Sequence, residues 1–395
     1  LAQRALLVAA ADGDHALGEA QWARGMHVDG ARQALADQRR VRGLVDGHAV
    51  DQLGRVLVEL DTAVVAGADH FTPVEQGGGE VGRQAAHADH LRTAGDTLRG
   101  LVLSFAERVG ADLARWMERE CTFPNSMVDR IVPAATEEIA SAAKEALGMQ
   151  DECALSTETF WEWVIEDNFV DPSDAALLSR CGVRVTSQVH SYEEAKLRML
   201  NGSHSAMALM GAITGRAHIA DCIGSDHIQE FVHRLMTQEV APHLSRTDWA
   251  DYRDALIQRF GNPYLKHSVH QIATDSSQKI PQRWPPSVLG QIAQGASFEH
   301  HALAAAVFVR YTLAVDEQGQ AYALNDPQAE SLMALGAAQR TEHAACVRAL
   351  LAREDLWGNA LPGNANWTAR VTHWHQQVLQ HGVDAAIQQL LAAQA

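Results

Sequence analysis

The sequence predicts a protein of mixed architecture, with an α/β part followed by an all-α part. Two observations lead to this prediction. Residues 160–170 (FWEWVIEDNFV) combine aromatic and β-branched residues, which favour an extended segment. Beyond Ser191, apolar residues recur at helical spacing almost to the C-terminus. The chain has 395 residues, of which 47% are apolar, so two domains with a large core are expected.

The elements can be predicted in chain order. Residues 101–118 have helical periodicity, and the helix is expected to end near Cys121. Residues 122–126 (TFPNS) predict a turn, followed by an apolar pair at Met127 and Val128. In the helical part, breaks are expected at the prolines, namely Pro242, Pro263, Pro281, Pro285, Pro286 and Pro362.

The charge and hydropathy patterns exclude some kinds of partner. A formal net charge of -17 argues against nucleic acid, whose phosphates require basic surface. It does not exclude a small anionic substrate, because the local charge of a pocket can oppose the global charge. No apolar run reaches the roughly 18 residues of a membrane span, and the N-terminus lacks the order of a signal peptide. We therefore expect a cytoplasmic protein with no membrane partner.

Cysteines and histidines do not indicate a metal site. The five cysteines form no CxxC pair, so we expect reduced thiols buried as small apolar residues, at Cys121, Cys153, Cys181, Cys222 and Cys346. Two histidine clusters, at 300–301 and 373–375, could suggest a metal. Neither has metal-ligand spacing with a nearby carboxylate, so no metal is predicted.

The first hundred residues differ from the rest of the chain. They contain no Ile, Lys, Asn, Ser, Cys or Tyr, although strands, turns and caps normally use these types. Two interpretations remain open: a gene region read in the wrong frame or decayed, and an Ala-rich helical region of biased composition. Gly77, Gly79 and Gly82 match G-x-G-x-x-G, but Pro73 and polar residues precede them instead of a buried strand. We interpret these glycines as a chance cluster.

Residues 191–204 (SYEEAKLRMLNGSH) have the composition of a catalytic helix. Ser191 and Glu194 form a capping-box pattern, which predicts that a helix begins at Ser191. At about 100° per residue, Asn201 lies about 140° and His204 about 80° from Lys196, so all three share one broad face. A glycine within a helix costs about 1 kcal/mol, so Gly202 indicates a close approach to the backbone.

These three residue types suit the reduction of a carbonyl group. A lysine whose pKa is lowered by burial can donate a proton, and an asparagine amide can stabilise a developing oxyanion. A histidine can bind substrate hydroxyl or carbonyl groups. From spacing alone, however, solvated or structural roles for the three residues remain the commoner interpretation.

Several ordered motifs resemble the mannitol dehydrogenase family, also called the polyol-specific long-chain dehydrogenases. Lys196, Asn201 and His204 match its K-x-x-x-x-N-x-x-H active-site motif. Further blocks resemble the family between about residue 98 and the C-terminus, at 123–133 (FPNSMVDRIVP), 163–169 (WVIEDNF), 259–263 (RFGNP), 271–273 (QIA) and 277–283 (SQKIPQR). The segment 1–97 contains no recognisable family motif.

The resemblance implies a fold, a cofactor and a reaction. The implied fold is a partial Rossmann-like domain, its remainder at 98–185, followed by a helical substrate domain at 186–395. Residues 197–204, 310–319 and Gln271 look more like fructuronate reductases (mannonate oxidoreductases) than mannitol dehydrogenases, which tend to have arginine at the latter position. The implied reaction is the reduction of D-fructuronate to D-mannonate with NADH, without metal. Preference for NAD over NADP and the oligomeric state stay open.

By the same resemblance, Lys196 is the general acid/base, Asn201 an oxyanion donor and His204 a residue that orients substrate. Lys279 and Gln271 are implied to bind substrate, which would be a small sugar acid or a polyol. Two further residues are implied to lie at the cofactor, Val128 and Asp129. Two alternatives remain: a mannitol or other polyol 2-dehydrogenase, and a non-catalytic truncated remnant of the family.

Overall fold

The computed structural model describes residues 93–394. These residues divide into two compact units, one containing 93–125 and 167–175, the other 126–166 and 176–394. The glycine cluster at 77–82 and the hypotheses about segment 1–97 lie outside the described residues, except for 93–97. All candidate site residues lie in the larger unit.

The smaller unit contains two helices, α5 (Ala94–Val109) and α6 (Ala111–Glu120). Their apolar faces pack through a cluster that includes Val102, Ala106 and Met117. The helix predicted at 101–118 is thus confirmed, but it is interrupted at Gly110, which caps the first helix and precedes the second.

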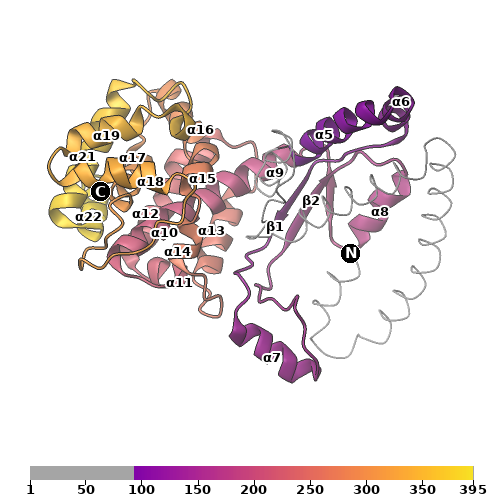
Figure 1. Ribbon diagram of the computed structural model, residues 1–395, viewed down its shortest axis with the longest axis horizontal. Helices are drawn as coiled ribbons and strands as arrows, with labels where there is room; N and C mark the ends of the chain where they lie inside the picture. Colours follow the sequence, from indigo (N-terminus) through magenta and orange to yellow (C-terminus); the bar gives the residue numbers. More distant parts are fainter. Residues whose placement is uncertain (1–92, 395) are drawn as a thin grey trace. The chain divides into compact units, whose positions relative to one another are not determined.

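A three-stranded sheet lies in the larger unit, in the order β1 (Ser126–Asp129), β2 (Glu162–Glu166) and β3 (Arg184–Thr186). β1 and β2 pair antiparallel and appear side by side in Figure 1, whereas β2 and β3 pair parallel. Helix α8 (Pro172–Arg180) lies between β2 and β3 in the chain, as expected for a parallel crossover. The predicted extended segment at 160–170 is confirmed as β2, although the strand itself is shorter.

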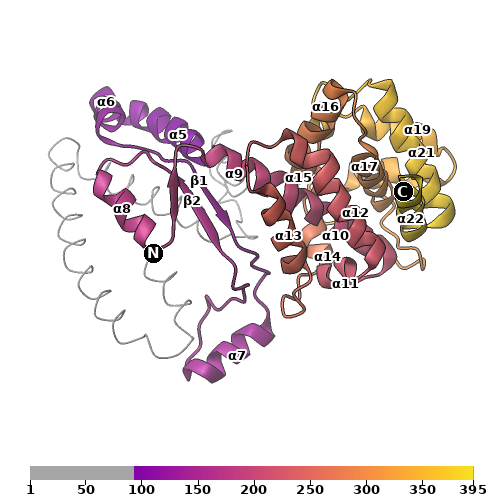
Figure 2. The same cartoon turned by 180° about the vertical axis from the view of Figure 1, so that it is seen from behind.

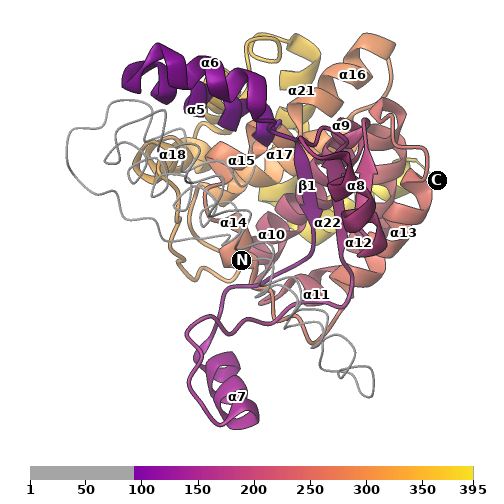
Figure 3. The same ribbon diagram turned by 90° about the vertical axis from the view of Figure 1, so that its right-hand side faces the viewer.

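The connection between β1 and β2 contains α7 (Glu137–Leu147). Thr136 caps its first turn by accepting a hydrogen bond from the Ile139 amide, and Gly148 ends it in the left-handed conformation. No residue of α7 is buried, and the helix stands apart from the other helices of its unit in every view (Figure 1, Figure 2 and Figure 3). Lys266 pairs with Glu138 at 3.0 Å, which ties α7 to the helical body through an exposed contact.

The remainder of the larger unit is helical, which confirms the prediction for the region beyond Ser191. One continuous helical segment consists of α9 (Val189–Ala195), the π-helix η2 (Lys196–Asn201) and α10 (Gly202–Thr214). The helices that follow are α11 (Ile219–Ile223), α12 (Asp226–Arg234), η3 (Leu235–Val240), η4 (Ala241–His243), α13 (Trp249–Phe260), α14 (Val269–Ala273), α15 (Ser276–Arg283), α16 (Pro285–Gln294), α17 (Glu299–Tyr311), α18 (Ala329–Ala337), η5 (Ala338–Arg340), α19 (His343–Leu351), α20 (Glu354–Trp357), α21 (Ala365–His381) and α22 (Val383–Ala393).

Two predictions about helix ends are wrong. The helix predicted to begin at Ser191 begins at Val189, and the Ser191 hydroxyl donates to the Gln188 carbonyl instead of capping Glu194. Pro281 was expected to break a helix but lies inside α15. Because proline has no amide hydrogen, it removes one bond from this helix, which ends two residues later at Arg283.

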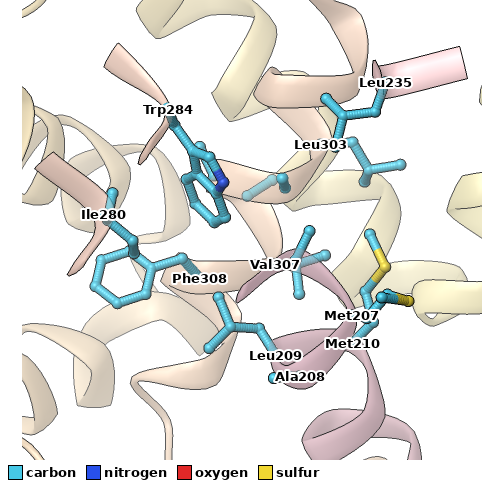
Figure 4. Close-up of a cluster of buried hydrophobic side chains, with 14 of the residues drawn as sticks. Met207, Ala208, Leu209, Met210, Leu235, Ile280, Trp284, Leu303, Val307 and Phe308 are labelled. Carbon is cyan, nitrogen blue, oxygen red and sulfur yellow. The ribbon is translucent and has the colours of Figure 1, made fainter. Parts of the chain in front are cut away.

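The core of the larger unit surrounds α10 and α17. Every residue of α10 from Gly202 to Ile213 is buried, as expected for a helix that is apolar on all sides. Figure 4 shows Ile280 of α15, and Trp284 directly after this helix, beside Phe308 of α17 in this core. The helix that carries the candidate residues is therefore held from several directions.

The cysteines only partly follow the prediction. Cys222 and Cys346 are buried, whereas Cys153 and Cys181 are exposed and Cys121 is half-buried. The prediction that the cysteines are buried is therefore wrong for Cys153 and Cys181, which lie outside the helical core. Within residues 93–394, no helix is long and apolar enough to span a bilayer.

A buried carboxylate caps the N-terminus of α17. Glu239, from the last turn of η3, accepts hydrogen bonds from the backbone amides and the Nδ1 atoms of His300 and His301, at 2.6–2.9 Å. These bonds, together with the favourable position at a helix N-terminus, lower the pKa of Glu239 to about 2 although burial alone would raise it. The sequence analysis singled out this histidine pair but did not identify Glu239 as the carboxylate that binds it. No group of residues suited to hold a metal ion occurs in the described part of the chain.

The first testable prediction concerns the variant Glu239→Gln. The ordinary pKa of 4.5 falls to about 2 in the folded state. The carboxylate therefore stabilises the fold fully above pH 4.5 and loses this effect as the pH falls toward 2. A shift of this size corresponds to about 3 kcal/mol at pH 7. Urea unfolding of the wild type and of Glu239→Gln should show this difference in the free energy of unfolding at pH 7 and a much smaller difference at pH 3.

Glu138→Gln provides a matched control, because Glu138 pairs with Lys266 on the surface. An exposed pair contributes at most about 1 kcal/mol, so this variant should unfold like the wild type. An equal loss of stability at pH 3 and pH 7 in Glu239→Gln would contradict the ionic role.

Candidate active site

The candidate catalytic residues lie where a π-turn interrupts an α-helix. The amide of Gly202 donates to the carbonyl of Leu197, five residues earlier. In an α-helix the bonded residues are four apart, so a π-turn contains one more residue per turn. Lys196 and Asn201 are five residues apart and therefore lie about one turn apart on one side. Asn201 and His204 then follow with the i, i+3 spacing of neighbours on an α-helical face.

This geometry corrects the prediction made for a uniform α-helix. There, Asn201 was expected about 140° around the helix from Lys196, within one broad face. The π-turn makes this angle smaller, so we expect the Lys196, Asn201 and His204 side chains on a narrower face of the helix. π-Turns of this kind are frequent at functional sites.

The amide of Asn201 has unused hydrogen-bonding capacity. The side chain is 8% exposed, and its Oδ1 atom has no hydrogen-bond partner among the described residues. A buried amide without a partner costs about 1–3 kcal/mol, which a bound ligand can recover. Lys196, one turn away, is only partly buried, so its amine is within reach of a ligand at the same face.

His204 is held neutral by its surroundings. It is 6% exposed, and its ring lies 5.0 Å from the rings of Phe260 and His267. Burial lowers its pKa well below 6.5, and the nearby charges act in the same direction, from His267, Arg283, Arg259 and Lys279. A neutral imidazole at pH 7 can both donate and accept a hydrogen bond.

A small cavity adjoins His204. Its volume is about 10 Å³, which is close to the space of one water molecule. Polar groups of His204, His267 and Arg259 line it, beside apolar side chains that include Ile131 and Phe260. This space is too small for a sugar.

The predicted substrate-binding residues lie on the two short helices α14 and α15. Lys279 is partly buried and its Nζ atom donates to the Ile272 carbonyl at 3.4 Å. Gln271 is partly buried on α14, which packs against α10. No hydrogen bond within residues 93–394 joins the Gln271 side chain to Lys196, Asn201 or His204. Helix α15, which carries Lys279, therefore contacts the catalytic helix, whereas Gln271 makes no hydrogen bond to the three catalytic candidates among the described residues.

The end of α15 is fastened to the catalytic helix. Arg283 donates to the Asn201 carbonyl at 3.1 Å and to the Ser205 hydroxyl at 2.6 Å. The Trp284 indole donates to the Gly202 carbonyl at 3.1 Å. Two consecutive residues therefore bind two consecutive carbonyls where the π-turn meets α10.

The predicted cofactor residues occupy neighbouring positions of β1 but have opposite environments. Val128 is 57% exposed. Asp129 is fully buried and accepts hydrogen bonds from the Tyr252 hydroxyl at 2.6 Å and from Arg259 at 2.6 and 3.0 Å. This arrangement gives Asp129 a role in joining β1 to α13. Its proximity to a nicotinamide ring stays a prediction.

Arg259 also binds Glu158, with its Nε and Nη2 atoms at 2.9 and 2.8 Å. Burial alone would lower the pKa of Arg259, but the bonds to Asp129 and Glu158 raise it overall. The guanidinium also lies 4.0 Å from the centre of the Phe160 ring. Sequence reasoning noted the RFGNP block but missed these partners, because they lie more than a hundred residues away.

Comparisons with known proteins can now be set beside this geometry. A small sheet with a parallel pair is followed by a helical body that carries Lys196, Asn201 and His204. Residues 86–176 match the family model of the mannitol dehydrogenase Rossmann domain, and residues 188–379 match that of the mannitol dehydrogenase C-terminal domain. The chain belongs to the mannitol dehydrogenase family, and the predicted fold class is confirmed.

Individual relatives support the same assignment. D-mannonate oxidoreductase of Escherichia coli K12 is 40% identical over 297 residues, which cover 74% of this chain and 60% of the relative. Mannitol 2-dehydrogenase of Phaeosphaeria nodorum is 38% identical over 252 residues, covering 62% of this chain and 44% of the relative. The chain thus spans about 60% or less of the length of these relatives.

A solved structure shares the fold. Mannitol 2-dehydrogenase of Pseudomonas fluorescens, in a ternary complex with NAD and D-mannitol, has a TM-score of 0.68 and 30% identity. The similarity covers 77% of this chain and 61% of the relative. With the Rossmann family model, this relative confirms NAD as the cofactor expected for this class of protein.

The second prediction distinguishes structural from cofactor-binding roles of Asp129. Replacement by asparagine leaves Arg259 and Glu158 buried with one carboxylate fewer. Removing one partner of a buried ion pair typically costs 3–5 kcal/mol, so Asp129→Asn should unfold at a much lower urea concentration. Tyr252→Phe, which removes a single hydrogen bond to the same carboxylate, should cost about 1.5–3 kcal/mol. Unchanged stability with weakened NADH binding would instead favour a direct cofactor contact.

The third prediction concerns two glycines of α10. The sequence indicated a close approach at Gly202, but an added Cβ there would meet its nearest atoms at 3.7 Å, in ordinary contact. Gly211 is the crowded one, since a Cβ would lie 2.7 Å from Cys222 and Val269. Gly202→Ala should therefore raise the free energy of unfolding by up to about 1 kcal/mol, whereas Gly211→Ala should lower it. Thermal unfolding of both variants checks this contrast, and a destabilised Gly202→Ala would contradict it.

Proposed function

We propose that this chain carries the substrate-binding and catalytic part of an NAD-dependent oxidoreductase that reduces a keto-uronate, D-fructuronate, to D-mannonate. The observation that supports the proposal is the π-turn at Lys196–Asn201, which lessens the angle between these two residues and precedes His204 on the same continuous helical segment. A proton donor, an unpaired amide and a neutral imidazole are the groups that a ketone needs as it becomes an alcohol.

The proposed mechanism assigns each residue one task. Lys196 donates a proton to the carbonyl oxygen, and removes it in the reverse direction. Asn201 donates a hydrogen bond from its amide Nδ2 to this oxygen as negative charge develops, and its unpartnered Oδ1 can accept a hydrogen bond from a substrate hydroxyl. His204, neutral at pH 7, binds the carbonyl or an adjacent hydroxyl and so orients the substrate. Lys279 places a positive charge near the same pocket, which suits the carboxylate of a sugar acid.

The described residues offer one surface that fits the nicotinamide. The exposed Val128 side chain on β1 is apolar and can contact the face of such a ring. NADH, when bound, supplies the hydride to the keto carbon.

Two other functions stay possible outcomes of the test. Mannitol or another polyol is the alternative substrate, in view of relatives named mannitol 2-dehydrogenase and a solved relative holding D-mannitol. A non-catalytic remnant is the other, since the first hundred residues differ in composition from the rest of the chain. The support for a sugar acid is the positive charge around His204 and the likeness to D-mannonate oxidoreductase.

The fourth prediction is that the chain binds NADH and reduces D-fructuronate, and calorimetry tests the binding first. The purified chain should bind NADH with saturation in the micromolar range, about -8 kcal/mol. It should then reduce D-fructuronate faster than fructose. Folded protein that binds no NADH would identify the chain as a remnant, and faster turnover of fructose would identify a polyol enzyme.

The variant Lys196→Ala tests the mechanism itself. Loss of a general acid lowers the rate constant by about 10²–10⁴-fold, while NADH affinity should stay unchanged. Lys266→Ala is the matched control, because its amine pairs with Glu138 on the surface and the Lys266 side chain is 66% exposed. Full activity of Lys196→Ala would exclude the proposed role.

A further inference from the structure

Arg283 has an unusual environment for a buried cation. Its residue exposure is 4%, and its hydrogen bonds go to two neutral acceptors, the Asn201 carbonyl and the Ser205 hydroxyl. No carboxylate of the described chain pairs with it. Burial lowers the pKa of Arg283 to about 9, and no opposing charge restores it. The guanidinium nevertheless stays protonated at pH 7.

Other buried arginines of the same unit show the contrast. Arg198 pairs with Glu194, and Arg259 pairs with Asp129 and Glu158. Arg246 pairs with Glu162 and Asp248. Arg310 binds two carbonyls, but the nearby carboxylates of Asp316 and Glu317 offset part of its burial. Arg283 is set apart because neither an ion pair nor a neighbouring carboxylate compensates its charge.

A second cation lies on the same side of α15. Lys279 precedes Arg283 by four residues, and this spacing places both side chains on one helical face. Both charges also act on His204, whose pKa each of them lowers. Two positive charges on α15 therefore act on the catalytic helix at His204. An uncompensated buried charge is costly, and an anion bound at that face would remove the cost.

We propose that Arg283 is a specificity-determining residue, which selects a carboxylate-bearing sugar over a neutral one by placing an unpaired positive charge behind Asn201 and His204. This inference rests on the proposed function, because it concerns the substrate of the same site. Arg283 acts through the field of its charge and through its hold on the Asn201 carbonyl. It favours the binding of an anionic substrate, while a neutral polyol gains nothing from it.

The test compares binding of D-mannonate and D-mannitol to the full chain by calorimetry, without cofactor. Wild type should prefer D-mannonate. Arg283→Met should weaken D-mannonate binding about tenfold or more and change D-mannitol binding less than about twofold. Arg283→Lys keeps the charge and should retain most of the preference. Circular dichroism melting of each variant shows that the protein compared is folded.

Arg310→Met is the matched control, since it removes another buried arginine that binds backbone carbonyls. It should leave the preference unchanged. An equal loss of both ligands in Arg283→Met would mean a structural role and would overturn the inference. Wild type that binds neither ligand, or binds both equally, would overturn it too.

Turnover separates this inference from the proposed function. If wild type prefers D-mannonate and Arg283→Met loses the preference, but D-fructuronate is not reduced, the inference stands and the function fails. If D-fructuronate is reduced and Arg283→Met slows D-fructuronate and fructose by the same factor, the function stands and the inference fails.

Discussion

The ion pairs of Arg259 hold the larger unit together where its strands meet its helices. One guanidinium on α13 binds Asp129, the last residue of β1, and Glu158, four residues before β2. Glu158 in turn accepts the Ile131 amide at 2.6 Å, so the chain leaving β1 is fixed by the same carboxylate. Charged contacts thus set the position of the strands at this junction. The site depends on them, since Arg259 also lines the cavity beside His204.

A second arginine extends this junction. Arg246 binds Glu162 at the start of β2, and its guanidinium lies 4.8 and 4.1 Å from the ring centres of Tyr192 and Tyr252. Tyr252 donates to Asp129, so both arginines belong to one connected network. Such networks resist small displacements, because moving one member leaves other buried polar groups without partners. The catalytic helix, which contributes Tyr192, is held at its beginning by this network and at its middle by Arg283 and Trp284.

The sequence predicted the types of elements well and their junctions poorly. The extended segment at 160–170 followed from its residue types and the helical body from periodicity, and both are local properties. The helix break predicted at Pro281 is wrong because the restriction that proline imposes is local. The packing that keeps α15 helical is tertiary and cannot be seen in the sequence. The π-turn was missed for a related reason, since no residue type marks it.

The candidate site shows the same division. The motif containing Lys196, Asn201 and His204 was found from the sequence, and the structure brings these residues onto one face. The neutral state of His204 and the isolation of Arg283 could not be predicted. Both depend on side chains from distant parts of the chain, and burial and charge arise only when these meet.

The π-turn makes the length of the segment from Lys196 to Asn201 as important as its composition. A π-turn holds one residue more than an α-turn, and each residue of an α-helix turns the chain by about 100°. Removing one residue between the two would replace the π-turn by a regular α-turn, and adding one would rotate every side chain before the insertion by about 100° relative to the core. Tyr192 and Arg198 could then not both keep their contacts. In evolutionary terms, this stretch should tolerate exchanges of side chains far better than changes of length.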